Sequence, residues 1–144
     1  MRRVAVLSIL LLLPLILSSH YENENYEGYL CTYYRMRSYA LIEAIIHVES
    51  RGDSLAFNRH ENAAGALQIR PIMVREANRI VGRNEYSLAD RWSVKRSIEL
   101  FIVVQNHYNP RIDFENGARL WNGGRVDAKG TEDYWRKVKG RLRW

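Results

Sequence analysis

The sequence predicts a predominantly helical α+β fold in a single domain. Apolar residues recur at a helical spacing in five windows after residue 37. Two short candidate strands lie in a turn-rich passage between the first two of these windows. About 125 residues follow the apolar N-terminal run, which is enough for one hydrophobic core but not for two. The expected architecture is a helical domain over residues 38–144, with a small β excursion after its first helix.

The first 19 residues have the tripartite pattern of a secretory signal peptide. A basic start with Arg2 and Arg3 precedes an apolar run over residues 4–17, and small residues follow it. The run has about 14 residues, fewer than the roughly 20 that a membrane-spanning helix needs. We therefore expect cleavage after Ser19, export to the periplasm or the extracellular space, and no stable membrane span afterwards. An uncleaved anchor is the weaker interpretation.

Residues 20–37 form a separate, tyrosine-rich segment in which glutamates alternate with asparagines at the start. This composition predicts an irregular N-terminal arm. Its tyrosine rings could stack on sugars, because each has a flat apolar face and a polar tip. Packing of these rings against the domain is the interpretation that we favour.

The charge balance is basic. The chain has 22 lysines and arginines against 16 acidic residues, a formal net charge of +6, and loss of Arg2 and Arg3 with the leader lowers it to +4. These charges are spread along the chain, so they suit an anionic envelope polymer, a membrane surface or a nucleic acid without choosing among them. Cys31 is the only cysteine, which excludes an internal disulfide framework.

The first expected helix, residues 38–50, carries a carboxylate on its apolar side. Apolar residues at the i, i+3, i+4, i+7 spacing define a buried stripe, and Glu49 lies about 40° from Ile45 and about 20° from Ile42 on the same helical wheel. A carboxyl group beside isoleucine side chains loses hydration, which raises its pKa and lets it donate a proton near neutral pH. The alternative is a glutamate at the helix end that tilts into solvent or pairs with an arginine.

The turn-rich passage covers residues 51–69. We expect one strand at residues 56–58 and another at residues 66–69, on either side of a polar turn at residues 59–62. Gly65 is expected to allow a backbone geometry or a close approach that a side chain would block.

Two helices follow this passage. Pro71 in the first turn and Gly82 after the last predict a helix between them. Its buried side is expected to carry Ile72, Met73, Ala77 and Ile80. The next helix should begin near Asp90 or Ser93 and run to residue 109, and its apolar residues on most sides over residues 100–104 indicate a central, buried helix.

Residues 112–121 are predicted to form a fourth helix, which Asn122, Gly123 and Gly124 close. Thr131 is the expected N-cap of the last helix, because acidic residues follow it in the first turn. That helix ends in a run of lysines and arginines. We interpret this run as a solvated face rather than as a nucleic-acid-binding site.

Several other chemistries lack the residues that they need. The four histidines do not have the spacing of a metal site, and no Gly-x-Ser-x-Gly elbow is present. Cys31 lies in the arm rather than at a helix start, where a reactive thiol is expected. We therefore predict no metal and no cofactor, and a site that works through carboxylates.

Four motifs, in order, resemble those of the soluble lytic transglycosylases, relatives of goose-type lysozyme. They are Glu49-Ser50 at a helix end, the segment Gly65-Ala66-Leu67-Gln68-Ile69, the turn Trp121-Asn122-Gly123-Gly124, and Tyr134 on the closing helix. The resemblance spans residues 39–138. It departs from the family pattern where Gly-Leu-Met becomes Gly65-Ala66-Leu67, and where the tyrosine of a Tyr-Asn turn becomes Trp121.

The resemblance implies a lysozyme-like domain, with its β excursion beside the catalytic helix and a cleft that binds peptidoglycan glycan strands. Glu49 would be the catalytic residue, which protonates the glycosidic oxygen and then takes the proton of the muramic acid C6 hydroxyl, leaving a 1,6-anhydro end. Residues expected to bind the substrate or to brace Glu49 are Ser50, Gln68, Trp121, Asn122 and Tyr134. Helix capping, a strand amide and a core indole are the structural alternatives for Ser50, Gln68 and Trp121.

A lytic transglycosylase is our first interpretation, because a single acid/base suits an intramolecular reaction with a held hydroxyl. A lysozyme-type muramidase would need a second carboxylate, for which Asp53 and Glu61 are nearest in sequence, although no pattern fixes either opposite Glu49. A cell-wall-binding protein without activity is a third interpretation. A basic exported protein that acts on membranes or nucleic acid is a fourth, although we expect no nucleic-acid partner.

Overall fold

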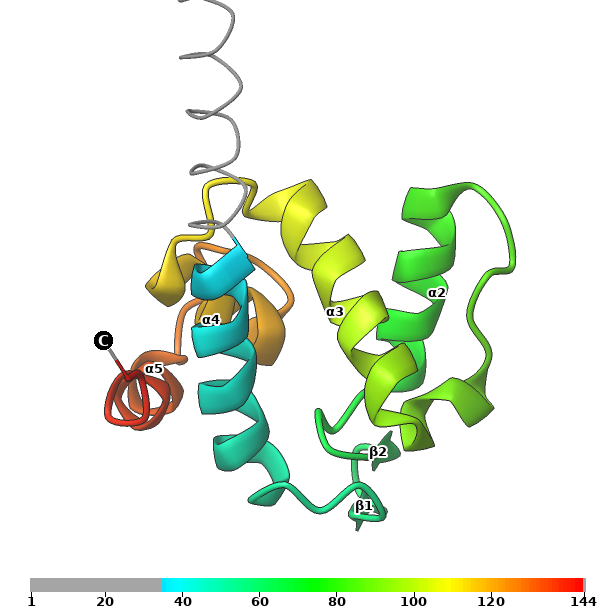
Figure 1. Ribbon diagram of the computed structural model, residues 1–144, viewed down its shortest axis with the longest axis horizontal. Coiled ribbons are helices and arrows are strands. Elements are labelled where there is room, and N and C mark those ends of the chain that lie inside the picture. The colour runs from blue at the N-terminus through cyan, green and yellow to red at the C-terminus, as the bar shows by residue number, and fades with distance from the viewer. Residues whose placement is uncertain (1–34, 144) are drawn as a thin grey trace, which may run out of the picture. The chain divides into compact units, whose positions relative to one another are not determined.

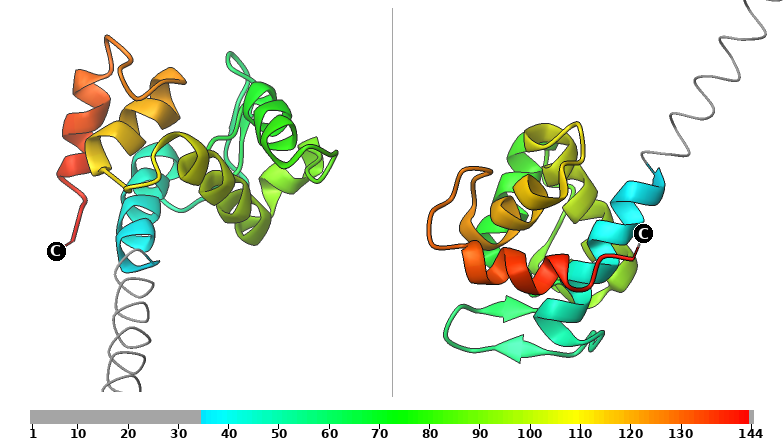
Figure 2. Two further views of the ribbon diagram at one scale, coloured as in Figure 1. Left: turned by 90° about the horizontal axis from the view of Figure 1, so that it is seen from above. Right: turned by 90° about the vertical axis from the view of Figure 1, so that its left-hand side faces the viewer.

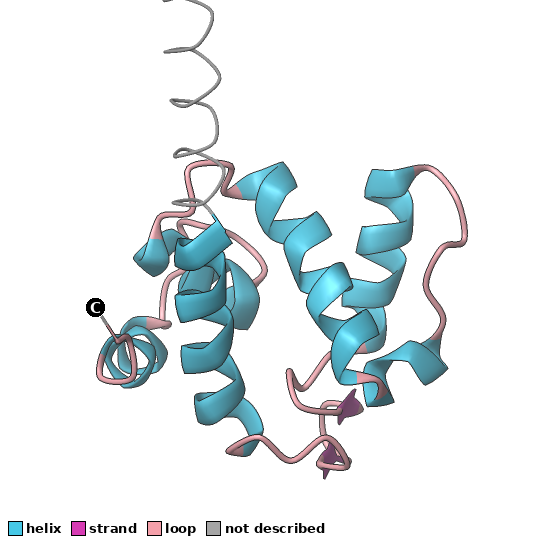
Figure 3. Cartoon of the chain, viewed as in Figure 1, coloured by secondary structure: helices cyan, strands magenta, loops and turns pink. Residues whose placement is uncertain are grey.

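The computed structural model describes residues 35–143. The expected signal peptide, residues 1–19, and the arm up to residue 34 lie outside the described residues. The described part is mostly helical and contains one two-stranded sheet, which confirms the predicted α+β class (Figures 1 and 3). A search of these residues finds no helix with the length and apolar character to cross a membrane.

The N-terminal helix, residues 35–50, buries the stripe that its sequence predicts. Leu41, Ala44 and Ile45 are at most 1% exposed, whereas Glu43 and His47 on the other side are exposed. The helix ends where Arg51 and Gly52 take positive φ values of 56° and 92°. Glu49 therefore lies in the last turn, just before the chain enters the β hairpin.

The hairpin is shorter than predicted. Strand β1 (Phe57–Asn58) pairs antiparallel with β2 (Ala63–Ala64) across the turn of residues 59–62, so the first strand and the turn are confirmed. The predicted second strand at residues 66–69 is wrong, because that segment forms turns and joins the sheet only through a single bridge from Ile69 to Ala64.

Two positive φ values explain why residues 66–69 do not extend. Gly65 has a φ of 79° and Gln68 a φ of 46°, so the chain turns twice within four residues. A Cβ on Gly65 would stand 1.8 Å from the carbonyl oxygen of Arg91. Both reasons predicted for this glycine, the conformation and the close approach, are therefore confirmed.

Helix α2 (Pro71–Val81) starts at its proline and stops at Gly82, which has a φ of 73°. Its buried residues are Met73, Val74 and Ala77. The expectation that Ile72 is buried is wrong, since 58% of it is exposed. Ile72 lies about 160° from Val74 around the helix, so it points away from the side that α2 presents to the core.

The region expected to start a helix near Asp90 or Ser93 contains two elements. A 3₁₀ helix, η1 (Leu88–Trp92), begins with a capping box between Ser87 and Asp90. Helix α3 (Val94–Tyr108) then begins at Ser93, whose side chain accepts from the backbone N–H of Arg96. α3 packs against α2, η1 and α4, which confirms its predicted central position.

Helices α4 (Phe114–Gly123) and α5 (Glu132–Lys139) complete the described part. α4 starts and ends two residues later than predicted, because Ile112 has a φ of 49° and Asp113 supplies the cap. Asn122 consequently lies in the last helical turn rather than in a closing turn. Thr131 occupies the N-cap position of α5 without a cap hydrogen bond; its hydroxyl donates to the Ala128 carbonyl and accepts from the guanidinium of Arg119.

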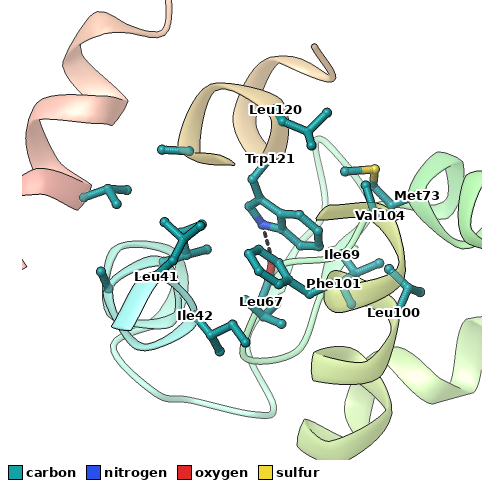
Figure 4. Packing of buried hydrophobic residues seen from close by; sticks show 14 of the residues in the cluster. Leu41, Ile42, Leu67, Ile69, Met73, Leu100, Phe101, Val104, Leu120 and Trp121 are labelled. Atoms are coloured by element: carbon teal, nitrogen blue, oxygen red, sulfur yellow. Dashed lines mark hydrogen bonds between the residues drawn. The ribbon is translucent and has the colours of Figure 1, made fainter. Parts of the chain in front are cut away.

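The elements enclose a hydrophobic core, shown in Figure 4. Its largest fully buried side chains include Leu41 and Ile45 from the N-terminal helix, Leu67 from the turn, and Phe101 and Leu120 from α3 and α4. This core fixes three segments relative to one another: the helix end with Glu49, the turn with Gln68 and the helix with Trp121.

Candidate active site

Glu49 is a partly buried carboxyl group at the end of the N-terminal helix. Its neighbours on that helix, Ile42 and Ile45, are 2% and 0% exposed, as the helical wheel predicts. Burial raises the pKa of Glu49 from 4.5 to about 7, with a smaller contribution in the same direction from Glu61. A group with this pKa is present in both protonation states near neutral pH, which is what a residue that first gives and then takes a proton needs.

Tyr134 contacts the reactive end of Glu49 directly. Its hydroxyl donates a hydrogen bond of 2.6 Å to Oε1 of Glu49, across 85 residues of sequence. Burial, followed by the charge of Glu49, raises the pKa of Tyr134 above its ordinary value, so this phenol keeps its proton and stays a donor. The hydrogen bond lowers the pKa of Glu49 and thus offsets part of the effect of burial.

Glu49 opens into a small cavity of about 40 Å³ between the helix end, the hairpin turn, α2 and α4. The residues that line it are Glu49, Glu61, Gln68, Arg70, Met73, Trp121 and Asn122. Four of the six residues singled out in the sequence are therefore together at this cavity, and Tyr134 joins them through its hydrogen bond. Ser50 is the exception.

Ser50 stabilises the helix end rather than lining the cavity. Its hydroxyl donates to the carbonyl of Ala66 at 2.8 Å and accepts from the backbone N–H of Gly52 at 3.1 Å. These contacts join the last turn of the helix to the turn that contains Gln68. Of the two roles expected for Ser50, the geometry supports bracing and not contact with a ligand.

Gln68 combines an unusual backbone with a fixed side chain. Its φ of 46° is rare for a residue other than glycine, and such conformations persist where the surrounding structure holds them. The Nε2 amide donates to the carbonyls of Ala56 and Gly65, both at 3.0 Å. The side chain therefore holds the turn together while it lines the cavity beside Glu49.

Trp121 belongs to both the core and the cavity. Its indole N–H donates to the carbonyl of Leu67 at 3.1 Å, and its ring centre lies 4.7 Å from that of Phe101. Figure 4 shows this hydrogen bond as a dashed line, with the ring of Phe101 beside the indole. Only 4% of the residue is exposed. The structural alternative, a core indole, therefore describes most of this side chain, and one part of it reaches the cavity wall.

Asn122 and the partly buried Arg70 form the rim of the cavity. Asn122 is exposed, and its backbone carbonyl accepts from the guanidinium of Arg70 at 3.2 Å. Sequence reasoning did not single out Arg70, since nothing but its place before Pro71 marks it. Its positive charge acts to lower the pKa of Glu49, so it belongs to the site.

The structure distinguishes the two carboxylates that were candidates for a second catalytic group. Glu61, in the hairpin turn, lines the same cavity as Glu49. Asp53 is not among the lining residues, and its carboxylate accepts from the backbone N–H of Leu55 at 2.8 Å. The hairpin thus brings Glu61, and not Asp53, toward Glu49.

Within residues 35–143, no three histidine, cysteine or acidic side chains are grouped so that they could hold a metal ion. The chain finds no match among protein-family models, curated proteins or solved structures. A functional assignment therefore depends on the residues and the geometry of the site.

Proposed function

We propose that this chain is an exported peptidoglycan lytic transglycosylase with a lysozyme-like domain. The observation that carries the proposal is the state of Glu49: a carboxyl group with a pKa of about 7, held by the Tyr134 hydroxyl at 2.6 Å, at the edge of a polar cavity. For a glutamate at a helix end with no catalytic role, exposure to solvent or pairing with an arginine would stabilise the charged form, whereas burial destabilises it.

In the first step, protonated Glu49 gives its proton to the oxygen that links muramic acid to the next glucosamine. The bond between C1 of the muramic acid and this oxygen then breaks, and the glucosamine leaves as an alcohol. The raised pKa supports this step, because part of the Glu49 population is protonated near neutral pH.

In the second step, the Glu49 carboxylate takes the proton of the C6 hydroxyl of the same muramic acid. O6 forms a bond to C1, which closes the 1,6-anhydro ring and returns Glu49 to its protonated state without consuming water. The Tyr134 hydrogen bond favours the carboxylate that this step requires. One acid/base is sufficient because the attacking hydroxyl belongs to the substrate.

The remaining cavity residues suit a carbohydrate ligand. Asn122 at the exposed rim and the partly buried Arg70 and Gln68 provide polar groups, and the surface of the cavity is mostly polar. Polar groups at fixed positions orient a bound ligand and give the site its specificity. A glycan strand would lie across this opening, since 40 Å³ is far less than the several hundred Å³ of a pocket that encloses its ligand.

A lysozyme-type hydrolase is the second candidate, and one observation favours it. Glu61 lines the cavity with Glu49 and is exposed to solvent, so it could activate a water molecule on the opposite side of the sugar. Paired carboxylates are the usual requirement for hydrolysis of a glycosidic bond.

The test is mass spectrometry of the sugars released from purified peptidoglycan by the wild-type protein, Glu49→Gln and Glu61→Gln. Anhydro-muramic products that require Glu49 and persist with Glu61→Gln would support the transglycosylase. Products heavier by one water, lost in both variants, would support the hydrolase. A folded wild-type protein that releases no sugar would contradict both and leave a wall-binding protein.

A further inference from the structure

A basic groove lies on the side of the N-terminal helix away from Glu49. Two adjoining hollows of about 390 and 430 Å³ form it, between this helix and the segment from α5 to Arg143. Figure 1 shows α5 end-on beside the upright N-terminal helix, and in the right-hand view of Figure 2 the two pass each other at an angle. We define the basic groove by its basic lining residues, which are His47, Arg51, Arg136, Lys137, Arg141 and Arg143.

The groove and the candidate active site use opposite sides of the same helix. His47 lies about 160° from Glu49 around the helical axis, and the two residues line different cavities. α5 likewise contributes Tyr134 to Glu49 and Arg136 and Lys137 to the groove. A ligand in the groove would therefore leave the Glu49 cavity open.

The charge of the groove has little internal compensation. Arg136 pairs with Asp133 at 2.8 Å, but both side chains are about 80% exposed, and such pairs are worth little. Within the described residues, Arg51, Arg141 and Arg143 have no ion pair. Glu43 is the one acidic residue in the lining of either hollow. Such a concentration of guanidinium groups attracts phosphate or carboxylate groups.

The lining distinguishes among the polyanions that a cationic surface can bind. Membrane-surface sites combine cations with exposed tryptophan, phenylalanine or leucine that enters the bilayer, and proteins that bind single-stranded nucleic acid stack its bases on aromatic rings. Among residues 35–143, the groove has no aromatic lining residue apart from His47, and its one leucine, Leu142, is 8% exposed. A concave, charged surface without these features fits a flexible chain of phosphate groups.

We propose that the basic groove binds a linear phosphodiester polymer without bases or acyl chains. This binding would hold the protein at the envelope while glycan is cleaved at Glu49. The envelope location rests on the proposed function, whereas the binding itself does not. The basic C-terminal run, which its sequence alone predicts to be a solvated face, thereby acquires a ligand class.

The probe is fluorescently labelled poly(glycerol phosphate), titrated with purified protein at several salt concentrations. The groove variant combines Lys137→Gln, Arg141→Gln and Arg143→Gln. The control variant removes the same charge from exposed positions outside the groove and combines Arg75→Gln, Lys95→Gln and Arg111→Gln. Glu49→Gln and the probes phosphatidylglycerol vesicles and duplex DNA are measured in parallel.

We expect the groove variant to lose roughly tenfold or more in affinity for poly(glycerol phosphate) and to show a shallower salt dependence, since each lost phosphate contact reduces the slope. The control variant should lose about threefold or less, and Glu49→Gln should bind as the wild type does. Equal losses in both triple variants would reduce the effect to net charge and overturn the proposal.

No binding of the polymer by the wild type, or a larger groove-dependent affinity for the vesicles or for DNA, would also overturn it. The outcome is separable from that of the proposed function. A protein that binds poly(glycerol phosphate) through the groove but releases no sugar contradicts only the catalytic proposal. One that cleaves peptidoglycan but does not bind the polymer contradicts only this inference.

Discussion

The hydroxyl of Tyr134 donates a 2.6 Å hydrogen bond to Oε1 of Glu49, so a residue of the last helix sets the protonation of a residue at the end of the first. The bond lowers the pKa of Glu49, whereas burial and Glu61 raise it. Burial and three side chains from three segments, Tyr134, Glu61 and Arg70, therefore determine how much of Glu49 is protonated at a given pH.

Tyr134→Phe should raise the pKa of Glu49, because it removes a hydrogen bond to the charged form. The high-pH limb of kcat/KM, which we expect near pH 7 for the wild type from the pKa of Glu49, should then move to higher pH. We expect kcat to fall about tenfold or more, since a hydrogen bond to a charged group is worth about 1.5–3 kcal/mol. The measurement is the pH profile of peptidoglycan cleavage.

Glu61→Gln is the matched control for that shift. It removes a negative charge that raises the pKa of Glu49, so the high-pH limb should move to lower pH. Shifts of both variants in the same direction would contradict the assignment of this limb to Glu49.

Glu49→Gln should stabilise the folded protein above neutral pH. The pKa of Glu49 is about 7 when folded and near 4.5 when unfolded, so its contribution to stability is complete below pH 4.5 and is lost as the pH rises through 7. Glutamine cannot ionise and does not incur this loss. The free energy of unfolding of Glu49→Gln relative to wild type should therefore increase by at most about 3 kcal/mol over this window.

Urea denaturation at pH 4.5 and pH 8 measures this difference. Glu43→Gln, on the exposed side of the same helix, is the control for loss of one carboxylate. If Glu49→Gln had the same relative stability at both pH values, the carboxyl group would not be perturbed in the folded protein.

Sequence periodicity was sufficient to predict the helices and the position of Glu49 among isoleucines, because both follow from side-chain spacing along one helix. It could not place residues 66–69. An apolar run with a glycine in front reads as a strand, yet the positive φ of Gln68 depends on carbonyls of Ala56 and Gly65 that accept from its amide.

The residues of the site also divide into those that the sequence predicts and those that only the folded chain brings together. Glu49 was found from the helical wheel and Gln68 from a motif, whereas the sequence did not mark Arg70 and could not distinguish Glu61 from Asp53, because Arg70 and Glu61 reach the cavity only where α2 and the hairpin turn meet. Trp121 was assigned to the cleft, but its N–H bonds to Leu67 in the core. Pairings between distant segments of this kind leave no local pattern in a single sequence.

Gly65→Ala should be strongly destabilising. An added Cβ would stand 1.8 Å from the Arg91 carbonyl oxygen, and alanine disfavours the φ of 79°. We expect a loss of about 3 kcal/mol or more in the free energy of unfolding, measured by urea denaturation. Gly52→Ala is the control, because Gly52 has a φ of 92° with no atom within 4 Å of the Cβ position and should lose only about 1–2 kcal/mol. Equal losses would mean that the contact with Arg91 is easily relieved.

Trp121→Phe should lower the free energy of unfolding by about 2–4 kcal/mol, because it removes the donor to the buried Leu67 carbonyl and leaves space beside Phe101. Trp135→Phe is the control, since Trp135 is only partly buried against the core and should lose about 1 kcal/mol. Thermal or urea unfolding of both variants measures the difference.

Because the Leu67 carbonyl lies one residue before Gln68, Trp121→Phe should also loosen the turn that lines the cavity, and hydrogen exchange at the backbone amide of Gln68 should increase. Unchanged exchange in a destabilised variant would limit the role of Trp121 to the core.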